Sequence, residues 1–190
     1  MADGRPIGEC YWVEHGRVLA GEYPGHWDPV MARRRVGAFL DAGVRRFIDL
    51  THPDDPIEPY KPLLLQAAGA KGVSADYCSF PIRDMGVPES AAAMTAILEA
   101  VRAGYQEDQR TYIHCWGGVG RTGVVVGCWL VECGLSGEAA LAELARRFVT
   151  MDKATRFRAS PQTWEQVGWI RSWTPRLGLR PPPLTGSHSN

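Results

Sequence analysis

The sequence lacks an excess of charge of either sign and lacks a long apolar run. Its 190 residues contain 21 Lys and Arg against 21 Asp and Glu, so the formal net charge is zero. Nothing in this balance favours a nucleic acid or an anionic surface as a partner. No stretch approaches the roughly 18 apolar residues of a membrane-spanning helix, and residues 1–10 have no signal-peptide apolar region. We therefore expect a chain without a membrane segment, and we expect it to be a monomer.

The cysteines do not form a paired pattern. There are five of them, an odd number, and no two are separated by only two residues. This argues against a disulfide framework and predicts a reducing, cytoplasmic location. Whether any of three cysteines forms a reversible disulfide with Cys115 under oxidant is left open. The three are Cys78, Cys128 and Cys133.

Strand-like and helix-like patterns alternate along a chain whose length fits one domain. A hairpin is expected from the runs 11–13 and 17–20, strands at 44–50, 73–81 and 111–114, and helices at 28–43, 63–70, 89–104, 121–131, 136–148 and 161–173. We therefore predict an α/β domain over residues 1–174, with a central, mainly parallel sheet flanked by helices. Residues 175–190 are Pro-rich without an apolar period, which predicts a disordered tail.

A glycine-rich stretch follows the last predicted strand and precedes an apolar helix. It reads His-Cys-Trp-Gly-Gly-Val-Gly-Arg-Thr-Gly over residues 114–123. Its glycines allow the loop amides to surround an anion, and Arg121 stands where the next helix begins. Such a positive field favours the thiolate of Cys115, the nucleophilic form. The stretch predicts a nucleophile beside a phosphate-binding loop, and the alternative is a turn with a buried cysteine.

The His-Cys, five residues, Arg-Thr-Gly pattern resembles the signature of the cysteine-dependent protein tyrosine and dual-specificity phosphatases. The resemblance implies a cysteine loop between a strand and the central helix, a metal-independent reaction and no cofactor. It also implies that Cys115 attacks phosphorus, Arg121 binds the phosphate, Thr122 assists breakdown of the phosphoenzyme and His114 sets the loop geometry. The phosphate-binding residues implied by the resemblance are Trp116, Gly117, Gly118, Val119, Gly120 and Arg121.

A proton donor is expected on a second loop. Asp84 lies 31 positions before Cys115, between a proline and a glycine, and Phe80-Pro81-Ile82-Arg83-Asp84 is similar to the general-acid loop of dual-specificity-type phosphatases. A leaving alkoxide or phenoxide needs such an acid. The alternative for Asp84 is a turn-forming role.

Three further features are weighed against ordinary structural roles. Gln162 and Gln166 resemble the glutamines with which tyrosine-specific phosphatases position the hydrolytic water, and the alternative is a solvent-facing pair. Tyr60 is a candidate substrate contact. The acidic loop 51–59 contains possible metal ligands, among them Asp55 and Glu58, but without preset spacing a solvated loop is expected and no metal is predicted.

The function expected from these features is a phosphatase acting on a phosphorylated protein or peptide. Phosphotyrosine is the expected substrate, with phosphoserine and phosphothreonine open. A phosphoinositide or inositol phosphate phosphatase with the same mechanism is the main alternative, although Trp116 and Val119 add no charge to the loop. A catalytically silent phosphate-binding module is a third.

Overall fold

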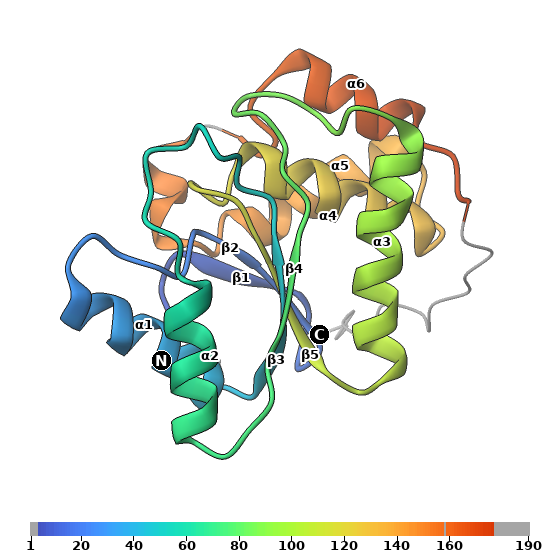
Figure 1. Cartoon of the computed structure of the whole chain (residues 1–190). Coiled ribbons are helices and arrows are strands. Elements are labelled where there is room, and N and C mark those ends of the chain that lie inside the picture. The colour runs from blue at the N-terminus through green and yellow to red at the C-terminus, as the bar shows by residue number, and fades with distance from the viewer. Residues whose placement is uncertain (1–3, 158, 177–190) are drawn as a thin grey trace, which may run out of the picture.

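A computed structural model describes residues 4–157 and 159–176. Its centre is a five-stranded sheet in the order β1-β2-β5-β3-β4, in which β1 is antiparallel to β2 and the other neighbours are parallel (Figure 1). The prediction of an α/β fold with a mainly parallel sheet is confirmed. The strands are β1 (Cys10–Glu14), β2 (Val18–Gly21), β3 (Val44–Asp49), β4 (Asp76–Ser79) and β5 (Arg110–His114).

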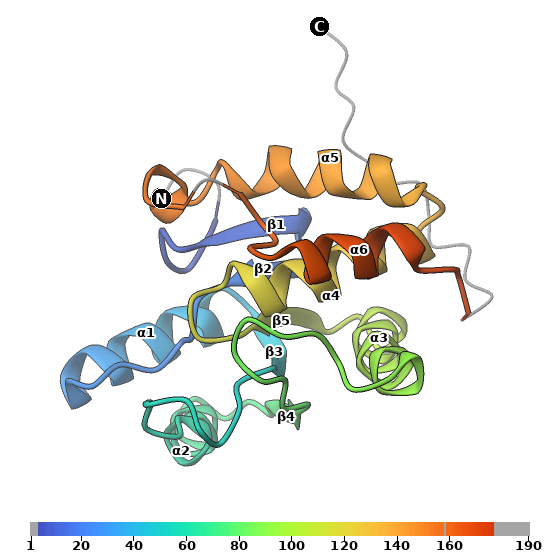
Figure 2. The ribbon, with the colours of Figure 1, turned by 90° about the horizontal axis from the view of Figure 1, so that it is seen from above.

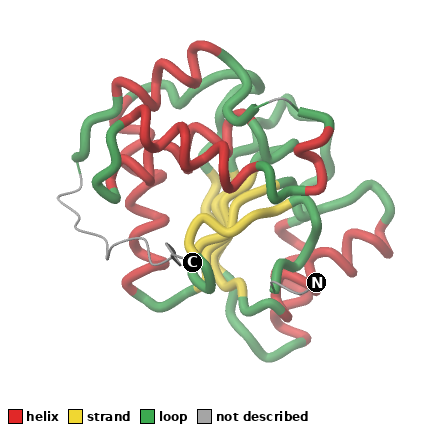
Figure 3. The backbone as a smooth tube through the Cα atoms, turned by 180° about the vertical axis from the view of Figure 1, so that it is seen from behind, coloured by secondary structure: helices red, strands yellow, loops and turns green. Residues whose placement is uncertain are grey.

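Helices cover both faces of this sheet, as Figures 2 and 3 show from above and from behind. One face carries α1 (Pro29–Asp41) and α2 (Lys61–Ala70). The other carries α3 (Ala91–Gln106) and α4 (Gly120–Glu132), with α5 (Gly137–Phe148) and α6 (Trp164–Ser172) packed against α4. A short 3-10 helix, η1, spans Asp152–Thr155.

Alternating side chains of the strands divide the core in two. On β5, Tyr112 lies in the core under α1 and α2, whereas Ile113 lies in the core under α3 and α4. Phe47 and Ile48 on β3 follow the same alternation, because successive side chains of a strand point to opposite faces. All residues of α4 are buried, so the helix after the cysteine loop is central, as its apolar sequence predicts.

Several predicted boundaries were wrong. β4 is shorter than the predicted 73–81, and α3 continues past Gly104, the expected end. A Cβ on Gly104 would lie 2.2 Å from Thr111 Oγ1, so this glycine lets α3 approach β5 closely. α6 starts at Trp164 instead of Pro161, because Thr163 is its N-cap and forms a capping box with Gln166.

Most of the predicted tail, residues 177–190, lies outside the described residues. At residue 176 the chain is still attached to the domain, since the Arg176 backbone N–H donates to Glu132 Oε1 at 3.0 Å. Within residues 4–157 and 159–176, no helix has the length and apolar character needed to cross a bilayer.

Candidate active site

The cysteine loop lies at the carboxyl end of the central strand. β5 ends at His114 and α4 begins at Gly120, so the loop follows a strand that is paired on both sides, with β2 and β3. Backbone bonds continue this pairing, with Leu50 N–H donating to His114 O at 2.9 Å and Tyr23 N–H to Trp116 O at 3.0 Å. The loops after β3, β4 and β5 gather at this edge (Figure 1), where parallel α/β sheets bind their ligands.

Gly118 makes the turn of the loop possible. Its φ is +74°, and a Cβ there would lie 2.3 Å from the backbone carbon of Gly21 and 2.5 Å from Glu22 N. Its N–H donates to Cys115 Sγ at 3.3 Å. Cys115 itself is 2% exposed. A side chain at position 118 would therefore displace the amide that bonds the sulfur.

Arg121 is held by three groups around its guanidinium. Nη1 donates to Asp55 Oδ2 at 2.6 Å and to Ile82 O at 3.0 Å, and Nη2 lies 3.1 Å from Asp84 Oδ1. Nε is buried and has no acceptor among the described residues. Burial alone lowers the pKa of Arg121, but the negative charges of Cys115, Asp55 and Asp84 more than offset it, so the pKa is raised. The side chain is therefore a fixed cation beside the cysteine.

The role of Asp55 was missed by the sequence analysis. The expectation of a solvated loop is wrong at this position, because the Asp55 side chain is only 4% exposed. Its Oδ2 also accepts from His52 N–H at 3.0 Å, which fixes the carboxylate toward Arg121. No local spacing signals this pair, since the two residues are 66 positions apart.

Asp84 lies at the mouth of the site, on the loop that follows β4. Two backbone bonds extend the sheet pairing into that loop, from Phe80 N–H to Asp49 O at 2.8 Å and from Ile82 N–H to Leu50 O at 3.2 Å. The Asp84 side chain is 55% exposed, unlike that of Asp55. The structure thus brings the predicted acid beside Arg121 with one side open to solvent.

A cavity of about 360 Å³ lies over the cysteine loop at this point. Its wall includes the predicted acid and the first predicted water-positioning glutamine. The lining residues are Glu22, Asp84, Met85, Trp116, Gly117, Val119, Lys153, Phe157 and Gln162.

His114 is entirely buried behind the loop. Its Nε2 shares a hydrogen bond of 2.7 Å with the Tyr60 hydroxyl, and its Nδ1 lies 3.4 Å from Cys115 O. Burial lowers the pKa of His114, although the nearby Asp49 opposes this effect. The structure thus places this imidazole directly behind the cysteine loop, and its positioning role stays a prediction. Tyr60 is 3% exposed, so the expectation that it contacts substrate is wrong.

Thr122 lies in the first turn of α4 and is fully buried. Its Oγ1 has no hydrogen-bond partner among the described residues. The bond to the cysteine sulfur that the resemblance implies is therefore not formed in this structure, and the hydroxyl remains unpaired beside the loop.

The two glutamines differ from the expected pair on one helix. Gln162 precedes α6, whereas Gln166 is fully buried within it. Gln166 Oε1 accepts from the N–H groups of Gln162 and Thr163 at 3.0 and 3.2 Å, and its Nε2 donates to Gly86 O at 2.9 Å. The Nε2 end of this amide thus ties α6 to the Asp84 loop, and the Oε1 end caps the start of α6. Gln162, on the cavity wall, is left as the candidate that can reach water.

Lys153 is a cation at the site to which no sequence pattern pointed. It lies on η1, and its Nζ donates to Gly117 O at 3.4 Å. It also forms an ion pair with Glu22, which pairs with Arg35 at 3.3 Å as well. The lysine charge beside the cysteine loop is therefore largely neutralised. Among the residues that the structure describes, no group of three His, Cys, Asp or Glu side chains is arranged to hold a metal ion.

A cysteine loop between a central parallel strand and a buried helix is the architecture of dual-specificity-type phosphatases. Solved structures show the same fold: Tk-PTP in its active form matches with a TM-score of 0.62 at 23% identity, covering 86% of this chain and 94% of that one. PTPMT1 in complex with PI(5)P matches with a TM-score of 0.64 at 17% identity, covering 87% and 94%.

The family model described as "Swiss Army Knife protein, DSP-PTPase phosphatase domain" matches residues 8–166, and the chain belongs to this family. The putative tyrosine phosphatase 067L of Invertebrate iridescent virus 3 is 29% identical over 118 residues, covering 60% of this chain and 42% of the viral protein. The mouse protein tyrosine phosphatase domain-containing protein 1 is 28% identical over 147 residues, covering 63% and 18%. The chain thus spans less than half the length of either relative.

Proposed function

We propose that this protein hydrolyses phosphotyrosine in proteins or peptides through a cysteinyl-phosphate intermediate. The observation that carries the proposal is the buried Arg121, a cation fixed between Asp55 and Asp84 with its Nε directed to no acceptor among the described residues. A buried guanidinium donor needs an anionic acceptor, and a phosphoryl oxygen matches its geometry. Cys115 begins the same loop, so its sulfur is the nucleophile for that phosphoryl group.

The chemistry has two steps that share the same residues. In the first, Cys115 Sγ forms a bond to phosphorus while the bond from phosphorus to the substrate oxygen breaks, and Asp84 gives its proton to that oxygen. In the second, water forms a bond to phosphorus, its proton passes to Asp84 and the sulfur leaves. Arg121 and the loop amides stabilise the charge on the phosphoryl oxygens in both steps. We assign Gln162 to orienting this water. Thr122 Oγ1 would donate a hydrogen bond to the sulfur as it leaves as a thiolate.

A second candidate keeps this chemistry and takes an inositol phosphate or a phosphoinositide. Lys153 on the cavity wall favours it, as does the fold shared with PTPMT1, solved with PI(5)P, and with the PP-IP phosphatase SIW14 of S. cerevisiae. Against it stand the ion pair between Lys153 and Glu22 and the uncharged side chains of Trp116 and Val119. Additional phosphates would meet little unpaired positive charge here.

A substrate panel tests the choice between these candidates. We expect phosphotyrosine peptides to be hydrolysed with a kcat/KM at least about tenfold above those of soluble inositol phosphates and of phosphoinositides in mixed micelles. Phosphate release is measured for each, together with phosphoserine and phosphothreonine peptides of the same sequence. A preference for the inositol compounds would transfer the proposal to the second candidate. Absence of release from every compound would contradict phosphatase activity.

Replacing Asp84 by asparagine separates the acid from the nucleophile. We expect Asp84→Asn to lower kcat for phosphotyrosine and phosphoserine peptides by roughly 10²- to 10⁴-fold, because the leaving oxygen then receives no proton. An aryl phosphate with a strongly acidic phenol needs little protonation and should lose much less. Asp41→Asn, an exposed carboxylate on α1, is the matched control and should leave all rates unchanged. Equal losses for good and poor leaving groups would contradict the assignment.

A further inference from the structure

A second, larger cavity adjoins the cavity over the cysteine loop. Its volume is about 680 Å³, and the two cavities share Glu22 and Trp116 in their walls. Part of a substrate that extends from the reacting phosphate past Trp116 would therefore enter it. The lining residues are Glu22, Tyr23, Gly25, His26, Trp27, Asp55, Pro56, Ile57, Glu58 and Trp116.

Aromatic surface at this cavity is exposed to an unusual degree. Trp27 is 85% exposed and Trp116 is 42% exposed, although tryptophan is ordinarily well buried. Exposed indole faces beside a hollow mark a binding surface, and they bind both apolar and cationic groups. The charge of the wall decides between these two.

The charge of the lining is negative. It contains three carboxylates and no lysine or arginine. Glu22 is paired with Lys153, and Asp55 with Arg121, so a cation of the protein already offsets the charge of each. Glu58 is exposed, and its carboxylate forms no ion pair with any residue of 4–157 or 159–176. Glu58 thus supplies the net negative charge of the wall.

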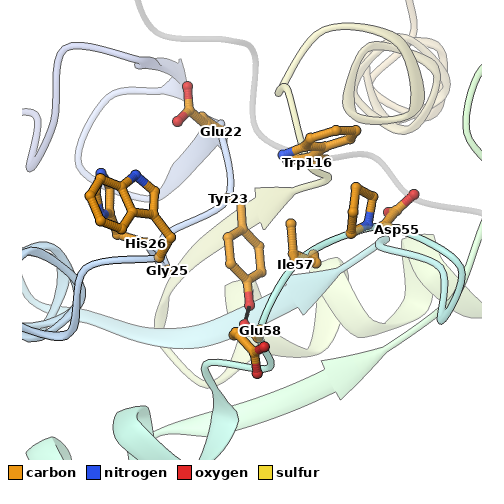
Figure 4. A pocket seen from close by; sticks show the side chains of 10 residues that line it. Glu22, Tyr23, Gly25, His26, Asp55, Ile57, Glu58 and Trp116 are labelled. Carbon is orange, nitrogen blue, oxygen red and sulfur yellow. Dashed lines mark hydrogen bonds between the residues drawn. The ribbon is translucent and has the colours of Figure 1, made fainter.

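The positions of these groups suit one elongated side chain. In the view of Figure 4, Trp116 lies in the upper part and Glu58 at the bottom, with Tyr23 and Ile57 between them. The Tyr23 hydroxyl donates to the Glu58 backbone carbonyl, and its oxygen accepts from Tyr60 N–H at 3.0 Å. These two bonds fix the position of the Tyr23 ring in the cavity wall. The His26 ring is engaged as well, since its Nδ1 accepts from Asp28 N–H at 2.9 Å. An apolar stem across Ile57 with a cationic end at Glu58 would match this wall.

From this wall we propose that the cavity binds an arginine or lysine side chain of the substrate, a few residues from the phosphorylated residue. The inference rests on the proposed phosphopeptide activity and adds a sequence preference to it. Arginine is the stronger ligand, because a guanidinium stacks on an indole while pairing with a carboxylate. A second acidic residue in place of the basic one would be repelled by Glu58.

The test is a phosphotyrosine peptide series with arginine, alanine, leucine or glutamate scanned through the positions on either side of the phosphotyrosine. For the wild type we expect one position at which arginine raises kcat/KM roughly 3- to 10-fold over alanine, an effect that salt reduces. In Glu58→Gln the arginine advantage should fall toward one, and in Glu58→Lys glutamate should replace arginine as the preferred residue.

Two controls make each outcome decisive. Hydrolysis of a small aryl phosphate should be unchanged in both Glu58 variants, because that substrate does not reach the cavity. Glu99→Gln, an exposed carboxylate on α3, should keep the full arginine preference. An advantage for leucine, or an arginine advantage that survives both Glu58 variants, would overturn the inference while leaving the phosphatase proposal intact. A wild type inactive on every peptide and on the aryl phosphate would instead refute the proposed function and the inference with it.

Discussion

Substitution of Cys115 by serine is expected to abolish turnover, with kcat falling by roughly 10⁴-fold or more. The hydroxyl of serine is not ionised near neutral pH, so it cannot attack phosphorus as a thiolate does. The contacts of Arg121 do not involve this atom, and the serine Oγ can still accept the hydrogen bond from Gly118 N–H, so the phosphate-binding loop should keep its shape. The variant should therefore bind a phosphotyrosine peptide with an affinity close to the wild-type KM.

The measurement is single-turnover phosphate release together with calorimetric titration of the peptide. Cys78→Ser, at a partly buried cysteine on β4, is the matched control and should retain activity. Retention of turnover in Cys115→Ser would contradict the proposed cysteinyl-phosphate mechanism. So would loss of wild-type activity on addition of a chelator, since the proposed steps use no metal.

Substitution of Arg121 by lysine is expected to lower kcat/KM by roughly 10³-fold despite the preserved charge. The guanidinium divides its donors between Asp55, Ile82 O and Asp84, and Nε is left for the substrate. A single ammonium cannot reproduce this planar arrangement. We expect kcat to fall and KM to rise, because the same donors bind the phosphate in the ground state and in the transition state.

The control for this variant is Arg102→Lys on α3, which should behave as the wild type. Thermal unfolding distinguishes a lost catalytic group from a lost fold, because Asp55 is buried and keeps a cationic neighbour in Arg121→Lys. Arg121→Ala would leave the Asp55 carboxylate buried without its cation and should also lower the midpoint of unfolding. An Arg121→Lys enzyme with more than about a tenth of wild-type kcat/KM would contradict the role proposed for the planar guanidinium.

Local patterns were enough to predict the strand, loop and helix that carry the nucleophile. The apolar run before His114 and the one after Arg121 predicted β5 and α4, and the glycines predicted a loop that closes around an anion. These features depend on neighbours in the chain, so their physical causes are contained in a short segment. The prediction failed at the start of α6, where the capping box at Thr163 outweighed the signal from Pro161.

The groups that complete the site come from distant segments. Gln166 reaches Gly86 across 80 positions and was assigned to water, whereas its amide serves to join α6 to the acid loop. Tyr60 was only a candidate substrate contact, and in the structure its hydroxyl braces His114 from 54 positions away. In both cases the sequence pointed to the residue but not to its hydrogen-bond partner, because packing decides which groups share a buried hydrogen bond.

The sequence by itself determined an α/β domain with a cysteine loop at the end of its last strand, and it located Cys115, Arg121 and the acid candidate Asp84. Only the tertiary structure decided how that arginine is held and which residues surround the mouth of the active site. The strand order places β5 between β2 and β3, so the loops that follow these strands and β4 meet at one edge. That meeting brings Asp55 and Glu58 to the site, and the packing of η1 beside the cysteine loop adds Lys153; no spacing along the chain encodes either arrangement.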